Sequence, residues 1–492
     1  MRSIFHYDSS VAFLGTWGRF QLIIFFLLCF TILPNGMGSF SFVFLTDTPR
    51  HRCRIPEANL SQEWHGYSED CVDGWVYSTE IYQSTVVSQY DLVCGHRWKQ
   101  PLTTTIFFLG VLGGSFISGV ISDKFGRKPV LFTTIIIQAV FTLVQIAAPT
   151  WEVIGGTNCG SVGEILTGNA RVVYSSTGVC LGFTLGYMML PLFAYFIRTW
   201  EMLLVAIGVP GLICIPLWWV LPESPMWLLS QGRVMEAEAI VRKAAKMNRV
   251  VAPEKIFDDS KLQASEKRPV EHYTVSDLLR KRTPQLLYSQ VLTANCHVCR
   301  FSMSICYYGL SLNTSQLHSD PYISCFLSAV VEVPAYLSCS LAIRYLPRRM
   351  AVLAVFLIMG VALFSIQLVP QSILGLAVAL EMLGKFGATA GTSLLFAFTA
   401  ELYPTSLRNT ASGLCLMVSR TGSYIFFKYL SYITLGILAM LSILATLFLP
   451  ESFGHPLPET LQHMQKRQRC DIVFFIFILH QLLSDTVQIN TY

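Results

Sequence analysis

Long apolar runs separated by short polar breaks form the main pattern of this chain. Eleven runs are long enough to cross a hydrocarbon core of about 30 Å as helices of roughly twenty residues. The runs are Phe20–Leu45, Leu102–Ile121, Val130–Ala148, Val172–Ile197, Met202–Leu221, Leu286–Leu312, Tyr322–Leu346, Ala351–Val369, Ile373–Thr399 and two short spans within Ser412–Leu449. Because a bilayer offers no hydrogen-bond partner to open backbone, the sequence predicts an all-α, polytopic membrane protein.

A hydrophilic stretch, residues 222–285, separates five of these runs from the other six. It holds twelve of the 35 Lys and Arg residues and no spanning run. We therefore predict a cytoplasmic linker between two transmembrane halves, residues 1–221 and 286–450, followed by a cytoplasmic tail, residues 451–492, with an atypical apolar end. Two six-helix halves joined by a long linker are typical of the major facilitator superfamily, whose substrate site lies between the halves.

The first half is one span short of six. Residues 150–171 contain no apolar run able to cross a membrane. With the N-terminus in the cytoplasm, a span restored here would return the basic hinge at residues 344–349 to the cytoplasmic side, as the positive-inside bias favours. The sequence therefore indicates a twelve-span design from which the fourth helix of the first half is missing.

The loop between the first two spans, residues 46–100, has features of the extracellular face. It contains three cysteines, Cys53, Cys71 and Cys94. These are disulfide candidates, with one thiol left over, in an oxidising compartment. The loop also carries a glycosylation sequon at Asn59, and a second sequon at Asn313 follows a span that the same plan ends outside.

The composition narrows the class of protein. Only 13% of the residues are charged, where a soluble domain carries about a quarter, and 53% are hydrophobic. A soluble protein and a nucleic-acid-binding protein are therefore excluded. No nucleophile and base constellation or cofactor loop occurs in the sequence, so we predict no enzyme. Cys296 and Cys299 have the spacing of a metal-binding pair, but they lie in an apolar run without a second pair, so we predict no metal site.

The hinge between the second and third spans carries a specific motif. It combines small residues, an acid and a basic pair: Gly119, Asp123, Gly126, Arg127 and Lys128. Gly119 permits close helix approach, and Asp123 can pair with basic groups and a helix N-terminus in one conformation and lose them in another. The motif matches the cytoplasmic loop signature of major facilitators and predicts a conformational latch. The alternative is a plain positive-charge anchor.

Two further motifs extend the predicted latch. Pro-Glu-Ser-Pro at residues 222–225 closes the first half, and Pro-Glu-Ser at residues 450–452 repeats its core after the second half, as an internal duplication would. A third motif begins with Glu-Leu-Tyr-Pro at residues 401–404. The candidate latch residues in and beside these motifs are Glu223, Arg233, Glu401 and Arg408.

Together with the cysteine-bearing loop, these motifs resemble those of the organic ion transporters. Seven stretches resemble the organic cation/carnitine transporters: Ala12–Gly15, Pro34–Gly36, His51–Arg54, Cys71–Trp75, Leu190–Arg198, Glu332–Tyr336 and Tyr345–Arg349. The resemblance implies a multi-pass plasma-membrane transporter of carnitine, betaines or other organic cations. It implies no cofactor, with sodium as a coupling ion in some members. The missing span and apolar tail indicate a truncated or alternatively spliced form.

Charged residues inside spans are costly and are therefore candidates for function. Four lie in the second half: Glu332, Glu381, Lys385 and Arg420. The resemblance places Arg420 where the carnitine branch carries Arg, and a guanidinium can bind a carboxylate through two hydrogen bonds. The alternative is an intramolecular pair between Arg420 and one of the two acids.

Aromatic rings are the natural receptor for a quaternary ammonium group. Tyr195, Tyr307 and Tyr308 lie on spans expected to line the cavity, although an aromatic residue in a helix can also serve packing alone. The predicted substrate-binding residues are these three with Arg420, Glu332 and Lys385. The predicted partners are a small-molecule substrate and membrane lipid.

Two other functions are left open. The missing span breaks the inverted repeats of the first half, so a transport-incompetent isoform is one alternative. A sugar or polyol porter shares the Pro-Glu-Ser-Pro motif, but it does not explain the cysteine-bearing loop or Arg420.

Overall fold

The computed structural model describes most of the two transmembrane halves. The described residues are 10–15, 18–54, 74–151, 153–154, 174–253, 256–257, 284–312, 320–370, 373–402, 415, 418–419 and 432–453. The predicted missing fourth span, the first of the two short spans within 412–449 and the linker residues 258–283 lie mainly or wholly outside these residues.

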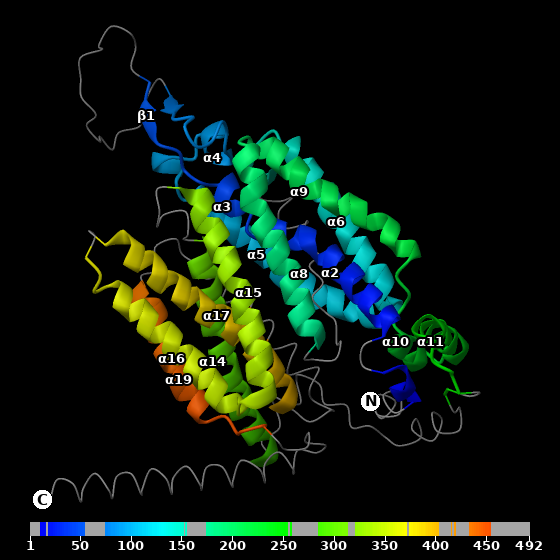
Figure 1. Ribbon diagram of the computed structural model, residues 1–492. Helices are drawn as coiled ribbons and strands as arrows, with labels where there is room; N and C mark the ends of the chain where they lie inside the picture. The colour runs from blue at the N-terminus through cyan, green and yellow to red at the C-terminus, as the bar shows by residue number, and fades with distance from the viewer. Residues whose placement is uncertain are drawn as a thin grey trace, which may run out of the picture.

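Two groups of helices lie side by side, the first blue to green and the second green to orange (Figure 1). The first half consists of α2 (Arg19–Ser39), α3 (Phe42–Leu45), α5 (Lys99–Phe125), α6 (Arg127–Ile146), α8 (Tyr174–Phe196), α9 (Trp200–Cys214) and the 3-10 helix η4 (Ile215–Trp219). The second half consists of α14 (Pro284–Leu312), α15 (Pro321–Tyr345), α16 (Arg348–Ile366), α17 (Leu374–Leu402) and α19 (Tyr432–Leu447).

The helices follow the apolar runs of the sequence. Five helical stretches among the described residues are long and apolar enough to cross a membrane: Arg19–Leu45, Arg127–Ile146, Trp200–Trp219, Pro321–Tyr345 and Arg348–Ile366. Two shorter apolar helices are Cys180–Phe196 and Tyr432–Leu447. The prediction of an all-α, multi-pass membrane fold is confirmed.

Short strands and helices outside the membrane-spanning helices lie at the two ends of the helical bundle. At one end, the strand β1 (His51–Cys53) pairs antiparallel with β2 (Trp75–Tyr77), next to α4 (Val86–Gln89) and the 3-10 helix η3 (Cys94–His96). At the other end lie α10 (Pro225–Ser230) and α11 (Val234–Asn248), against which the 3-10 helix η1 (Ala12–Leu14) packs. We call these the loop end and the linker end.

Glycines bring α2 and α8 into close contact within the first half. A Cβ at Gly36 would overlap the carbonyl of Phe183, and one at Gly186 would overlap the carbonyl of Leu33. Small residues permit such close approach of helices in a membrane, where packing drives association. This contact holds α8 beside α2, and α8 in turn packs against α15 of the second half.

Candidate functional site

Glu223 caps the N-terminal end of α6 at the linker end. Its carboxylate accepts hydrogen bonds from the backbone N–H groups of Arg127 (3.1 Å) and Lys128 (3.2 Å). These amides have no partner within the helix, and they carry the positive end of its dipole. Gly126 turns the chain into α6 with a φ of +107°, and a Cβ there would lie 2.8 Å from a Glu223 oxygen. This turn therefore requires glycine.

Glu451 caps the N-terminal end of α16 in the same way. Its carboxylate accepts hydrogen bonds from the backbone N–H groups of Arg348 (2.8 Å) and Arg349 (3.0 Å). The Arg348 guanidinium also pairs with Glu401 on α17 at 3.1 Å. The Ser452 hydroxyl donates to the same Glu401 carboxylate at 2.7 Å. The second half therefore has its own capped hinge, linked to the third sequence motif.

The predicted latch residues of the first half make different contacts in the structure. Arg127 and Lys128 reach Glu223 through their backbone amides, and the Lys128 ammonium lies 5.0 Å from the centre of the Trp218 ring. Arg233 lies outside this group, because it is exposed and pairs with Glu236 within α11 at 2.7 Å.

The remaining latch candidates are described only in part. Gly119 and Asp123 lie in α5, but the surroundings of Gly119 and the side chain of Asp123 are outside the described part of the chain, as is Arg408. Sequence reasoning named neither Arg348 nor Glu451 as a latch residue. The repeated Pro-Glu-Ser motif and the Arg-Arg hinge at residues 348–349 were the available signals.

An ion pair buried between the two halves forms the centre of the molecule. The Lys385 ammonium on α17 lies 3.0 Å from a carboxylate oxygen of Glu332 on α15, and both side chains are at most 1% exposed. The Tyr307 hydroxyl donates to the same oxygen at 2.8 Å. The Thr184 hydroxyl, from α8 of the first half, donates to the other oxygen at 2.9 Å. Both oxygens of Glu332 are thus held, one of them across the halves.

Aromatic rings surround the Lys385 ammonium. Its nitrogen lies 3.7 Å from the centre of the Tyr307 ring, 5.5 Å from that of Phe40 and 5.7 Å from that of Tyr187. It also donates to the Ser311 hydroxyl. At these distances the rings attract a cation through their quadrupoles. The group formed by Lys385, Glu332, Phe40, Tyr187 and Tyr307 is called the central site below.

Four predicted substrate residues belong to this site or border it. Glu332, Lys385 and Tyr307 meet there, and Tyr308 packs behind them, with its ring centre 6.1 Å from that of Phe40 and 4.9 Å from that of Phe108. Sequence reasoning missed Phe40, Tyr187 and Thr184, since nothing in an apolar run distinguishes a site residue of these types from a packing residue.

Tyr195 lies elsewhere. It is 50% exposed at the loop end, where its ring packs against Tyr322 (5.7 Å between centres) and the Arg198 guanidinium (5.9 Å). The structure therefore does not bring Tyr195 to the central site. Arg420 lies outside the described residues, so its predicted role stays a prediction.

Contacts between the halves close the loop end. The ring of Tyr322, at the start of α15, stacks on that of Phe44 from the first half (5.5 Å between centres), and its hydroxyl donates to the Ile81 carbonyl at 3.0 Å. Beside it, the Tyr82 hydroxyl donates to the Asp47 carboxylate at 2.9 Å. Burial, reinforced by this carboxylate, raises the pKa of Tyr82, so its hydroxyl stays a donor.

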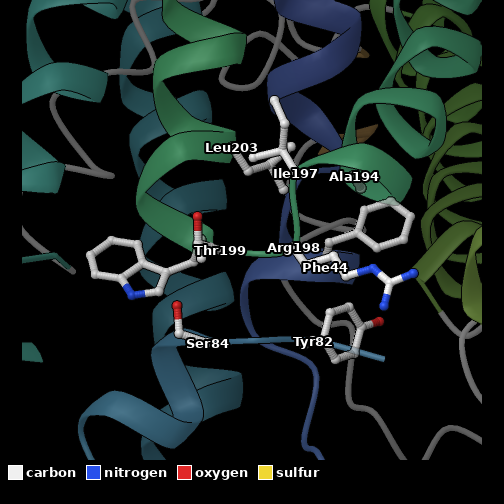
Figure 2. Close-up of a pocket in the computed structure, with 9 residues that line it drawn as sticks. Phe44, Tyr82, Ser84, Ala194, Ile197, Arg198, Thr199 and Leu203 are labelled. Atoms are coloured by element: carbon white, nitrogen blue, oxygen red, sulfur yellow. The ribbon is translucent and has the colours of Figure 1, made fainter. Parts of the chain in front are cut away.

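A small, open pocket lies beside these contacts. Figure 2 shows Phe44, Tyr82 and Arg198 on one side of it. The lining residues are Phe44, Tyr82, Ser84, Ala194, Ile197, Arg198, Thr199, Trp200 and Leu203.

The two described cysteines of the loop differ in whether they form a disulfide bond. Cys53 is disulfide-bonded, whereas Cys94 is free and exposed. Of the two described candidates, only Cys53 is therefore in a disulfide bond. Cys71 and the sequons at Asn59 and Asn313 lie outside the described residues.

Comparisons with known proteins agree with this architecture. A family model described as "Sugar (and other) transporter" matches residues 58–170 and 166–460. Solute carrier family 22 member 4 of Mus musculus is 44% identical over 94% of this chain and 95% of its own length. Organic cation/carnitine transporter 2 of Homo sapiens is 42% identical over 93% of this chain and 94% of its own.

The solved structures show the same fold at low sequence identity. The partially occluded inward open conformation of the xylose transporter XylE from E. coli has a TM-score of 0.55 and 16% identity, covering 93% of this chain and 100% of the other. The family model and the similar proteins show that the chain is a membrane transporter of the major facilitator superfamily and not an enzyme. Within this superfamily, the chain belongs to the organic cation/carnitine transporter family. The resemblance noted in the sequence is confirmed.

Proposed function

We propose that this chain is a secondary transporter of carnitine-like zwitterions and organic cations across the plasma membrane, working by alternating access. The central site is the observation that carries the proposal. It combines a carboxylate (Glu332), an ammonium (Lys385) and three aromatic rings between the two halves. Relatives from Rattus norvegicus, Mus musculus and Homo sapiens are each named organic cation/carnitine transporter 2, which supports this substrate class.

Without substrate, the Lys385 ammonium takes the position of the substrate cation. Its ammonium occupies the space among Phe40, Tyr187 and Tyr307 that a quaternary ammonium would fill. An incoming ammonium takes this place beside Glu332 and displaces Lys385. The carboxylate of a zwitterion then binds a cation, for which we propose Arg420.

Alternating access requires bonds between the halves that break when the halves rock. The hydrogen bond from Thr184 to Glu332 couples the halves at the central site. The contact of Phe44 with Tyr322 couples them at the loop end. Binding at Glu332 changes the first contact, and rocking of the halves opens the second.

Uptake of labelled carnitine tests the proposal in cells that express this chain, with surface biotinylation of the same cells. We expect uptake above that of untransfected cells and inhibition by tetraethylammonium. Replacement of sodium by N-methylglucamine tests sodium as the coupling ion, which we propose from the family resemblance. Surface protein without uptake of either substrate would contradict the proposal and favour the transport-incompetent isoform. Inhibition by sugars alone would favour the sugar porter.

A variant of Arg420 tests the carboxylate anchor separately. We expect Arg420→Ala to abolish carnitine uptake and to spare tetraethylammonium, because the aromatic contacts remain. If Arg420 instead pairs with a buried acid, both substrates should be lost together, and a charge swap with that acid should restore both.

A further inference from the structure

Glu381 is a buried acid that the central site does not use. It lies on α17 one helical turn before Lys385 and is 0% exposed. One of its oxygens accepts a hydrogen bond from the Tyr432 hydroxyl of α19 at 3.3 Å. The other oxygen has no hydrogen-bond partner in the described part of the chain. This differs from Glu332, both of whose oxygens are held.

The charges around Glu381 do not balance if both acids are ionised. Among the described residues, Lys385 is the cation that interacts with Glu332 and Glu381, and it pairs with Glu332 at 3.0 Å. A second ionised carboxylate here would be a buried charge without a counter-ion, which is strongly unfavourable inside a membrane protein. A bound proton makes Glu381 neutral and removes this penalty.

The neighbouring elements supply no further counter-charge among the described residues. The titratable group of α19 is Tyr432, and on α14 Tyr307 is already bonded to Glu332. The Arg300 guanidinium of α14, one turn from His297, donates to the Leu395 carbonyl and the Thr399 hydroxyl, 14 and 18 positions beyond Glu381 on α17. The charged residues of α16 are Arg348 and Arg349, whose amides and side chains are engaged at the linker end. Among the described residues, Lys385 is therefore the cation that can balance the charge of Glu381.

We propose that Glu381 is a proton-binding site that releases its proton when a substrate cation displaces Lys385 from Glu332. Residues four apart on a helix are neighbours, so the displaced Lys385 ammonium can pair with Glu381. The O–H bond of the Glu381 carboxyl then breaks, its electron pair stays on the carboxylate, and the proton leaves to water. One cation enters as one proton leaves, so the charge of the site is unchanged.

This inference rests on the proposed function only for the identity of the cation that displaces Lys385. The proton itself can be tested without substrate, by infrared spectroscopy of the purified, full-length protein at neutral pH. We expect the C=O stretching band of a protonated carboxyl, absent from Glu381→Gln and retained in the control Glu223→Gln, which lies at the linker end. Glu332→Gln should weaken the band, because Lys385 freed from Glu332 can pair with Glu381. A wild-type protein without the band, or a band that persists in Glu381→Gln, would overturn the proposal. If Glu381→Gln does not fold, Glu381→Asp keeps the carboxyl, and its band should shift in frequency; an unshifted band would likewise overturn the assignment.

Proton release tests the exchange. Carnitine or tetraethylammonium is added to the protein in weakly buffered solution with a pH-sensitive dye, while binding is followed by thermal stabilisation. We expect about one proton per bound cation in the wild type and none in Glu381→Gln. Binding without proton release would overturn the exchange. Absence of binding, with the infrared band present, would count against the proposed substrates and leave the protonated Glu381 supported.

Discussion

Glu223 and Glu451 occupy equivalent positions in the two halves of the protein. Each follows a proline after the last helix of its half, and each carboxylate accepts hydrogen bonds from the first two amides of an earlier helix, α6 or α16. The anion faces the positive end of the helix dipole in both cases. The repeated Pro-Glu-Ser motif therefore encodes the same contact twice, as expected of a duplicated fold.

Removal of either cap should slow transport more than it weakens substrate binding. The capping residues lie at the linker end, away from the central site, so they bias conformations of the halves. We expect Glu223→Ala and Glu451→Ala each to lose about 1 kcal/mol of stabilisation, roughly a fivefold change in an equilibrium, with a smaller loss for the Gln variants, which keep an oxygen acceptor. Uptake kinetics normalised to surface protein provide the measurement. An altered KM with an unchanged maximal rate would contradict the latch role.

The same reasoning ranks the neighbouring variants. Arg127→Ala keeps the backbone amide that binds Glu223, so we expect it to impair the rate less than Glu223→Ala does. Asp123→Asn should also impair the rate more than the affinity, as the motif in the sequence predicts. This order would be reversed if the Arg127 side chain formed the latch.

Residues with a strong local signal could be predicted from the sequence, and those that act through distant contacts could not. A charge in an apolar run is costly, so Glu332 and Lys385 stood out. The role of Thr184 depends on its hydrogen bond to Glu332, which lies 148 positions away in the sequence. Tyr195 was expected in the cavity because it lies on a span, but the sequence does not show that this tyrosine sits at the exposed loop end. Arg233 follows a motif, yet its exposed side chain pairs with Glu236 at the start of α11.

The buried pair of Lys385 and Glu332 should be sensitive to removal of one partner and tolerant of removal of both. A single variant, Lys385→Met or Glu332→Gln, leaves an uncompensated buried ion or donor, and breaking such a pair typically costs about 3–5 kcal/mol. We expect the double variant to recover much of the thermal stability in detergent, while uptake stays lost. A double variant as unstable as the singles would show that the pair has another structural task.

The contact between α2 and α8 should tolerate no side chain at Gly186. A larger residue meets the backbone of α2, which cannot move as a flexible side chain could. We expect Gly186→Val to destabilise the protein by about 1–3 kcal/mol and to reduce the amount of this protein at the cell surface. Gly375→Ala is a matched control, because a Cβ there has nothing within 4 Å. Equal surface levels for the two variants would contradict this packing argument.

The free thiol of Cys94 provides a test of the orientation of the protein. Cys94 is exposed beside the loop-end strands, whereas the described cysteines outside the loop are buried or half-buried. If residues 46–100 face the outside, a membrane-impermeant maleimide should label intact cells that express this chain, and Cys94→Ser should lose that labelling. A protease-cleavable tag is inserted near Asp259 in the linker. Protease added to the cells should cut this tag only after permeabilisation, since the linker is predicted to be cytoplasmic. Labelling of Cys94 only after permeabilisation, or cleavage of the tag from outside, would overturn the predicted orientation, because the two sites lie on opposite sides of the membrane in the twelve-span plan.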